Sequence, residues 1–306
     1  MLKEKTLVII IVSVVFIASI AGAAYMLNGT AGVEEPITID QKGSDTMYEL
    51  GTAWAQGIHK ENDKITVNVV GGGSSKGIQA LLNGTTDIAQ ASRPMSEEEL
   101  ATALELDLDP RELKVAIDGV AVIVNEDNPL ARMTMDQLEA LYLGDITDWS
   151  ELVDGFTGPV HLFGRNNNSG TYAYFKEVVL NKANYSTAMT ELAGNPALLN
   201  NVASDPLAIG YVGIGYAKDS SGIRILNLTG PDHPPASPLD AEAVISGQYV
   251  LSRYLYFYTN GVPEGLMAEY IDWVLDSEGG QKLAEEIGFY ALPDEMIREQ
   301  KMTIGL

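Results

Sequence analysis

The chain of 306 residues contains no cysteine, which excludes disulfide bonds, thiolate catalysis, zinc–cysteine sites and lipid attachment to an N-terminal cysteine. Histidine is nearly as scarce: the three present, His59, His161 and His233, stand in no recognisable ligand or catalytic motif. A catalytic zinc site needs several such ligands. We therefore expect neither a metal ion nor a cofactor.

Positive charge is also in short supply, because 19 Lys and Arg face 42 Asp and Glu and leave a net charge of −23. This balance argues against nucleic acid or an anionic membrane surface as a partner. Any anion that the chain binds must be held by backbone dipoles and a few cations, against an unfavourable overall field. An acidic surface also keeps an exported protein soluble.

Nucleotide-binding motifs are absent: neither G-x-x-x-x-G-K-[ST] nor G-x-G-x-x-G occurs. Residues 73–77 match the nucleophile elbow G-x-S-x-G, with Ser75 as the nucleophile, but no histidine stands in a partner motif for it. We therefore expect no catalytic residues. A secreted hydrolase of phosphate esters is the alternative from a different class.

One long apolar run is present, at residues 7–27, and it follows Lys3 and Lys5. About 20 apolar residues can span a bilayer, and positive charge before them places the rest of the chain outside. Small residues at 21–24 offer a signal-peptidase cleavage site. We predict export, to the extracellular face of the membrane or the periplasm, with residues 1–36 as a transmembrane anchor or cleaved signal peptide followed by a short linker.

Strand-like and helix-like segments alternate after the linker, which predicts an α/β fold with a largely parallel sheet. Ser96 with Glu99 and Thr134 with Gln137 form capping boxes that mark helix starts. We expect strands at 37–39, 65–70, 87–91, 115–124, 159–163, 208–214, 223–226 and 253–258, and helices at 47–59, 78–82, 134–143, 172–180, 264–276 and 280–287.

Three strand ends run through Gly and Ser or Thr into a helix, at residues 42–46, 71–77 and 164–171. A helix N-terminus offers unpaired N–H groups and partial positive charge, and ligands of open α/β sheets collect at such places. Arg165 adds a planar fork that suits a tetrahedral oxyanion, and Gly170 lets the backbone approach it closely. Three such turns predict several helix N-termini converging on one small anion.

Two strand-like crossings, near residues 117–120 and 252–256, indicate a chain that leaves one lobe and later returns to it. We assign residues 37–117 and 253–306 to lobe I and residues 118–252 to lobe II. A ligand cleft between the lobes would close by hinge bending.

Several motifs occur in order: G-S-D-T at 43–46, G-G-S-S-K-G-I at 72–78, D-I-A-Q-A-S-R at 87–93, G-D-I-T-D-W at 144–149, and G-R followed by S-G-T at 164–171. In these motifs the chain resembles the phosphate-binding proteins of high-affinity ABC phosphate importers, from residue 37 to nearly its end. The resemblance implies a two-lobed periplasmic-binding-protein fold of type II with phosphate buried between the lobes. It also implies delivery to a membrane permease with a cytoplasmic ATPase, and we expect a monomer.

The resemblance also assigns residues to the site. The family's phosphate-binding turn matches Arg165, Ser169, Gly170 and Thr171, its glycine-rich turn matches Ser74, and its first helix start matches Thr46 and Met47. With neighbours in the same turns, the candidate phosphate ligands are Ser44, Asp45, Thr46, Met47, Ser74, Ser75, Ser92, Arg93, Asp118, Arg165, Ser169, Gly170 and Thr171.

Two positions depart from the family pattern. Ser92-Arg93 stands where well-studied members carry an Asp, and Asn167 stands where they carry an acid. The first change removes the usual proton acceptor. The second leaves Arg165 without its usual local partner. Arg93 is expected to replace a donor or to pair with an acid of the site.

A carboxylate in the site would receive the proton that phosphate carries and repel sulfate, which carries none. Asp45 and Asp118 are the candidates, with Asp45 as a helix N-cap and Asp118 as a strand-bend or hinge residue as the structural alternatives. A binder of sulfate, molybdate or tungstate, and an anion-sensing or adhesion module without a transporter, remain open from the sequence.

Overall fold

A computed structural model describes residues 35–305. The apolar run at 7–27, predicted to be an anchor or a signal peptide, lies outside the described residues. Among the residues described, no helix is both long and apolar enough to cross a membrane.

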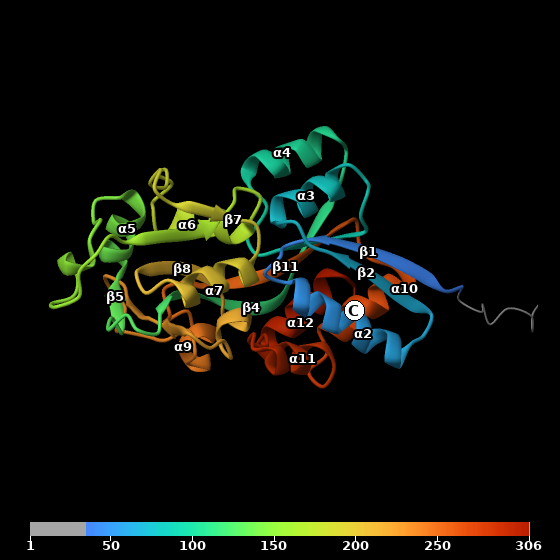
Figure 1. Ribbon diagram of the computed structural model, residues 1–306. Coiled ribbons are helices and arrows are strands. Elements are labelled where there is room, and N and C mark those ends of the chain that lie inside the picture. Colours follow the sequence, from blue (N-terminus) through green and yellow to red (C-terminus); the bar gives the residue numbers. More distant parts are fainter. Residues whose placement is uncertain (1–34, 306) are drawn as a thin grey trace, which may run out of the picture. The chain divides into compact units, whose positions relative to one another are not determined.

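One mixed sheet organises these residues (Figure 1). Its strand order is β2-β1-β3-β11-β4-β8-β6-β7, and β9 also pairs with β4. The strands are β1 (Ile37–Gly43), β2 (Ile65–Val70), β3 (Ile88–Ala91), β4 (Pro110–Asn125), β6 (His161–Arg165), β7 (Thr190–Leu192), β8 (Ala208–Gly213), β9 (Ile223–Ile225) and β11 (Ser252–Asn260). A separate parallel pair joins β5 (Arg132–Thr134) to β10 (Asn227–Thr229).

The prediction of a largely parallel sheet is wrong at its centre. The pairs β1–β2, β1–β3, β6–β8 and β6–β7 are parallel, but β11 pairs antiparallel with both β3 and β4. The reason is that the chain runs out along β4 and returns along β11. The β4–β8 and β4–β9 pairs are antiparallel as well.

The long strand β4 changes partners at the bend predicted from Asp118-Gly119. Residues Pro110 to Gly119 pair with β11, and residues Val120 to Asn125 pair with β8 and β9. Ser252, the first residue of β11, lies opposite Gly119. The two predicted crossings therefore run side by side, as β4 and β11 do in Figure 1.

Strands and helices alternate along much of the chain, as predicted, but β4–β5 and β9–β10 are consecutive strands and three helices follow β11 in succession. The helices are α2 (Tyr48–Glu61), α3 (Ser74–Leu82), α4 (Glu97–Glu105), α5 (Met135–Leu143), α6 (Gly170–Val178), α7 (Asn195–Ser204), α8 (Ile214–Ala217), α9 (Ala241–Ile245), α10 (Gly265–Val274), α11 (Gly280–Ile287) and α12 (Asp294–Thr303), with a short 3-10 turn at Trp149–Glu151. Both predicted capping boxes form, at Ser96 and at Thr134. The helix expected at 172–180 begins earlier, at Gly170, because Ser169 caps it.

Aromatic side chains fill the core on both sides of the crossing. Trp54 of α2 packs edge-on against Phe257 with ring centroids 5.5 Å apart and donates its indole N–H to the Gly280 carbonyl at 2.7 Å. Beyond the crossing, Phe175 of α6 stacks on Tyr211 at 4.0 Å between centroids. These contacts hold α2 and α6, whose first residues reach the candidate site, firmly on their strands.

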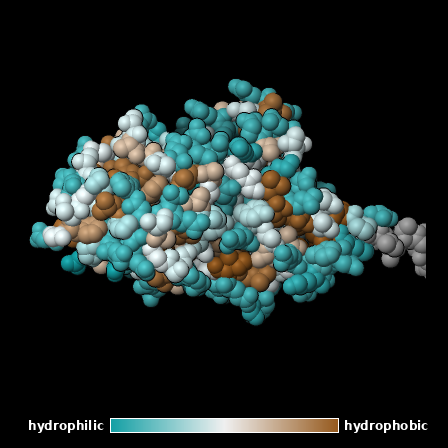
Figure 2. Space-filling model, in the orientation of Figure 1, coloured by the Kyte–Doolittle hydropathy of each residue, from teal (hydrophilic) through white to brown (hydrophobic). Residues whose placement is uncertain are grey.

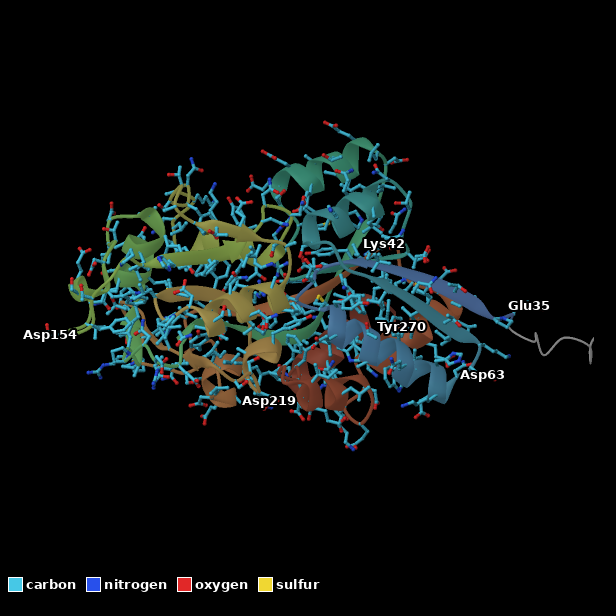
Figure 3. All side chains as sticks on the ribbon, in the orientation of Figure 1. Glu35, Lys42, Asp63, Asp154, Asp219 and Tyr270 are labelled. Carbon is cyan, nitrogen blue, oxygen red and sulfur yellow. The ribbon has the colours of Figure 1, made fainter. Side chains whose placement is uncertain are left out.

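The surface carries the acidic residues that dominate the composition. Asp63, Asp154 and Asp219, labelled in Figure 3, are exposed. Figure 2 shows hydrophilic residues surrounding separate hydrophobic patches on the visible face. Two arginines, Arg165 and Arg253, are buried in contrast to these acidic residues.

Candidate anion-binding site

The three turns predicted to converge do meet. Thr46 Oγ1 lies 2.9 Å from Thr171 Oγ1, which joins the first turn to the third. The amide of Ser75 donates to the Asn168 carbonyl at 3.2 Å, and this bond joins the second turn to the third. Each turn follows a different strand, so their meeting requires the sheet topology and could not be read from one motif.

Four hydroxyl groups form the centre of the site. Ser74 Oγ accepts a hydrogen bond from the Ser92 amide at 3.0 Å and lies 3.3 Å from Ser92 Oγ. The side chains of Thr46 and Thr171 complete the group, and each of the four residues is at most 1% exposed. Hydroxyls can both donate and accept, so a buried cluster of them can rearrange to surround an oxyanion.

Gly170 is required where α6 meets these hydroxyls. A Cβ atom built on it would lie 2.2 Å from Ser74 Oγ and 2.5 Å from Ser92 Oγ. Any other residue would push α6 away from the two serines. The close approach of the Gly170 backbone to two serine hydroxyls is therefore present, and its approach to an oxyanion stays a prediction.

Arg165 at the end of β6 is fully buried and held by three acceptors. Its Nη2 donates to Asp45 Oδ2 at 2.6 Å and to the Ala193 carbonyl at 2.9 Å, and its Nη1 donates to Asn195 Oδ1 at 2.7 Å. Burial lowers the pKa of Arg165, while the Asp45 carboxylate raises it. Asp45 thus supplies the acid partner that Asn167 cannot, from 120 positions away in the sequence.

Asp45 also ties the first turn to the second. Its Oδ1 accepts the Gly72 amide at 2.6 Å, and its backbone carbonyl accepts the Tyr216 hydroxyl at 2.8 Å. The alternative of a helix N-cap is wrong, because Met47 occupies the N-cap of α2 and no side-chain cap forms there. The carboxylate is free of that role because it bonds across the turns instead.

A second guanidinium, which the sequence did not single out, stands among the hydroxyls. Arg253 on β11 donates through Nε and Nη2 to Asp118 Oδ2, at 2.9 and 2.7 Å. Its Nη2 also donates to Thr171 Oγ1 at 2.9 Å and its Nη1 to the Ser92 carbonyl at 3.0 Å. An arginine inside an otherwise apolar strand, at the return crossing, was the signal that could have revealed it.

Asp118 lies at the crossing, as expected, and is completely buried. Its second oxygen, Oδ1, accepts the Ile214 amide at 3.0 Å. The carboxylate is therefore paired with Arg253 and bonded to the segment that follows β8.

Arg93 does not pair with Asp45 or Asp118, so that alternative is wrong, whereas its replacing a donor stays a prediction. Its Nη1 and Nη2 both donate to Glu99 at 2.7 Å, and Nη2 also donates to Ser75 Oγ at 3.0 Å. Burial raises the pKa of Glu99, but hydrogen bonds from Arg93 and Ser96 outweigh it and hold that pKa below its usual 4.5. The capping box at the start of α4 places Glu99 within reach, so the local pair forms.

The remaining predicted residues sit in the same turns. The Ser169 hydroxyl accepts the Thr171 amide at 3.1 Å, and the Met47 amide donates to the Ser44 carbonyl at 3.2 Å. Ser44 Oγ and Arg165 Nε are buried without a hydrogen-bond partner among the described residues.

The nucleophile-elbow reading gains no support from the structure. None of the three histidines, all in the described part of the chain, hydrogen-bonds to Ser75. His59 bonds to the Ile65 carbonyl, His161 to the Asp205 carboxylate and His233 to the Gln248 carbonyl. Ser75 bonds to Arg93 instead. Within residues 35–305 no cluster of His, Asp and Glu could hold a metal ion.

Two hollows adjoin the buried cluster. One, of about 310 Å³, is lined by Arg253, Tyr174 and the segment 244–247. The other, of about 630 Å³, separates the start of α4 from α6 and is lined by residues 93–98 and by residues of α6 that include Tyr172 and Lys176. Both hollows are lined by residues from opposite sides of the crossing, and a ligand cleft between two lobes stays a prediction.

Comparison with known proteins agrees with this geometry. Residues 29–278 match the family model of the PBP superfamily domain. The phosphate-binding protein PstS of Pseudomonas aeruginosa is 32% identical over 282 residues, which cover 86% of each chain. Protein SphX of Synechococcus elongatus is 28% identical and covers 90% of this chain, with 83% of its own length covered.

Solved structures confirm the predicted fold class. A putative phosphate ABC transporter substrate-binding protein from Clostridium perfringens, solved with bound phosphate, superimposes with a TM-score of 0.73 at 23% identity, over 84% of this chain and all of the other. A possible phosphate binding protein from Planctomyces limnophilus gives 0.65 at 28% identity, over 89% and 98%. From the family match and the PstS identity together, this chain belongs to the PBP superfamily and, within it, to the PstS family of phosphate-binding proteins.

Proposed function

We propose that this chain captures inorganic phosphate outside the cytoplasm and delivers it to the permease of an ABC importer. The observation that carries this proposal is the buried meeting of four hydroxyls, three from the converging turns and one from Ser92 after β3, with the guanidinium group of Arg253. The related proteins are named as binding proteins, which supports capture rather than turnover.

The proposed ligand shell is the set expected from the sequence, with Arg165 as its first cation. Thr46, Ser74, Ser92 and Thr171 would donate their hydroxyl hydrogens to the phosphate oxygens. Ser44 Oγ and Arg165 Nε have no hydrogen-bond partner among the described residues and would donate to the phosphate as well. Asp45, Met47, Ser75, Arg93, Asp118, Ser169 and Gly170 would shape and orient this shell.

Phosphate retains a proton at neutral pH, so the shell needs an acceptor as well as donors. Asp118 already takes three N–H groups, two from Arg253 and one from Ile214. Asp45 takes two, from Gly72 and Arg165, which leaves it the greater capacity to accept another hydrogen. We favour Asp45 as the proton acceptor for this reason.

Closure of the cleft would bury the ligand. We propose that residues 37–117 with 253–306 and residues 118–252 move as two lobes about the paired strands β4 and β11. Hydrogen bonds to charged groups contribute about 1.5–3 kcal/mol each, and micromolar binding needs about 8 kcal/mol net. Several such bonds suffice even after the ordering cost of closure.

The N-terminal segment would keep the protein at the outer face of the membrane or be removed after export. Its apolar length and the lysines before it support export. We propose that the exported part works as a monomer with the permease as its partner.

Titration calorimetry with inorganic phosphate, arsenate and sulfate tests this function. Phosphate should bind with one site per chain, arsenate should compete for it, and sulfate should bind at least ~10-fold more weakly. Two buried guanidiniums also suit a fully deprotonated oxyanion such as sulfate. If sulfate bound more tightly than phosphate, sulfate would become the proposed ligand. Absence of heat with all three anions would refute the proposal.

A further inference from the structure

Among residues 35–305, Arg253 is the one charged side chain that contacts hydroxyls on both sides of the site. Thr46 and Ser92 follow the strands β1 and β3, whereas Thr171 opens α6 after β6. Arg253 lies between them, with Nη2 at 2.9 Å from Thr171 Oγ1 and 3.4 Å from Thr46 Oγ1 and Nη1 at 3.0 Å from the Ser92 carbonyl.

We infer that Arg253 is a second anion-binding cation of this site and that Asp118 is its positioning residue. The inference rests on the proposed function and adds a specificity element to it. A second guanidinium, although paired with Asp118, adds N–H donors and positive charge beside those of Arg165 and so favours the dianionic form of the ligand.

The guanidinium of Arg253 is already oriented by its neighbours. Asp118 binds Nε and Nη2 through one oxygen, and its other oxygen is fixed by the Ile214 amide. Asp118 therefore fixes the orientation of the guanidinium plane. The Cζ atom of Arg253 also lies 5.3 Å from the centroid of the Tyr174 ring, over its face. A guanidinium held this way loses little further freedom when an anion arrives.

Arg253 also contacts hydroxyl groups of the site. Because Arg253 Nη2 donates to Thr171 Oγ1, that oxygen acts as an acceptor and its own hydrogen is free to point elsewhere. Thr46 and Thr171 share one hydrogen bond at 2.9 Å, so at least one of the two hydroxyls can donate to an anion. The arginine thus sets neighbouring hydroxyls as donors in addition to offering its own charge.

The Arg253–Asp118 pair is buried. Arg253 is 6% exposed and Asp118 is fully buried, so the field of the guanidinium is weakly screened. Arg253 also lowers the pKa of Arg165, after the larger effect of burial. The two cations therefore act on the same region, where they would act together on a ligand.

The charged groups near Arg253 are Asp118, Arg165 and Arg93, and the neighbouring tyrosines are Tyr174, Tyr254 and Tyr256. Burial raises the pKa values of Tyr174 and Tyr256. The histidine rings contact other partners. Between about pH 5.5 and about pH 8.5 the ligand itself is therefore the main titrating species, as it loses its second proton.

The test is calorimetry with inorganic phosphate across that pH range, on wild type, Arg253→Gln and Arg253→Lys. Wild-type affinity should rise with pH as the dianion forms. Arg253→Gln should weaken binding by about 10- to 100-fold at high pH and flatten the pH dependence, because one charged hydrogen-bond donor is lost. Arg253→Lys should keep the slope with an intermediate affinity, since it retains the charge without the fork.

Two further variants guard against a purely structural effect. Asp118→Asn with Arg253→Gln removes both charges together and leaves no unpaired buried ion, so it should fold and show the same flat profile. Arg111→Gln removes an exposed arginine, 38% accessible and paired with Asp109, and should bind as wild type does.

Affinity within about twofold of wild type for Arg253→Gln, or weakened binding with an unchanged pH slope, would overturn this role while leaving phosphate capture intact. Wild type that binds no phosphate would overturn both.

Discussion

Replacing Gly170 by alanine should separate closure of the site from stability of the fold. The added Cβ would stand 2.2 Å from Ser74 Oγ and 2.5 Å from Ser92 Oγ. Ordinary contact needs about 3.5 Å, so α6 would have to retreat from both serines by roughly 1 Å. The serines are short and fully buried, which leaves them no room to yield.

The magnitude follows from the nature of the clash. Overpacking of a well-packed interior costs about 1–3 kcal/mol, which corresponds to about 5- to 150-fold in affinity. This cost applies to the closed arrangement alone. When the turns are apart, alanine is the better helix residue by up to about 1 kcal/mol, so the unliganded protein should unfold at an unchanged or slightly higher temperature.

Phosphate calorimetry combined with thermal unfolding without phosphate would measure both effects. Gly194→Ala is the matched control, because its Cβ would meet only Pro196 at an ordinary 3.7 Å. Phosphate affinity of Gly170→Ala equal to that of wild type would refute the claim that these turns close around the ligand.

Three other substitutions test separate parts of the account. Arg165→Ala should weaken phosphate binding by at least ~10-fold, as measured by calorimetry. The variant should remain folded, because the Asp45 side chain is 22% exposed and water can solvate it, and a far-ultraviolet circular dichroism spectrum of an unfolded chain would contradict this. Asp45→Asn should lower affinity for phosphate relative to sulfate, and an unchanged ratio would remove Asp45 as proton acceptor. Glu99→Gln should make the free energy of unfolding less sensitive to acid. The pKa of Glu99 is lower in the folded protein than its usual 4.5, so the ionised carboxylate stabilises the fold above pH 4.5, and this stabilisation is lost as the pH falls through the folded-state pKa. Denaturant unfolding at about pH 6 and about pH 3.5 would check this, and equal acid sensitivity of the two proteins would contradict it.

Local sequence signals predicted the elements well. The capping boxes at Ser96 and Thr134 form, and the helix at Gly280–Ile287 has the expected bounds. These features depend on hydrogen bonds within a few residues, which adjacent sequence determines. The sheet direction at its centre did not follow, because pairing of β4 with β11 joins segments more than 130 positions apart.

The site shows the same division. Its three turns could be found from glycine, serine and threonine spacing, since each is a local strand-to-helix connection. The partners of its charges could not, because Asp45 reaches Arg165 and Asp118 reaches Arg253 only after the sheet is assembled. Arg93 shows the converse, since its acid partner Glu99 lies only six residues away in the sequence, within the capping box of α4.

We propose that hydroxyls from turns on both sides of the crossing, with the buried guanidiniums, enclose one tetrahedral oxyanion. A crystal structure of the protein grown with arsenate tests it most directly, because the anomalous signal of arsenic locates the anion without ambiguity. The account predicts a single arsenic position within hydrogen-bond reach of Thr46, Ser74 and Thr171 through its oxygens. Arsenic bound elsewhere, with these hydroxyls still bonded only to one another, would contradict it.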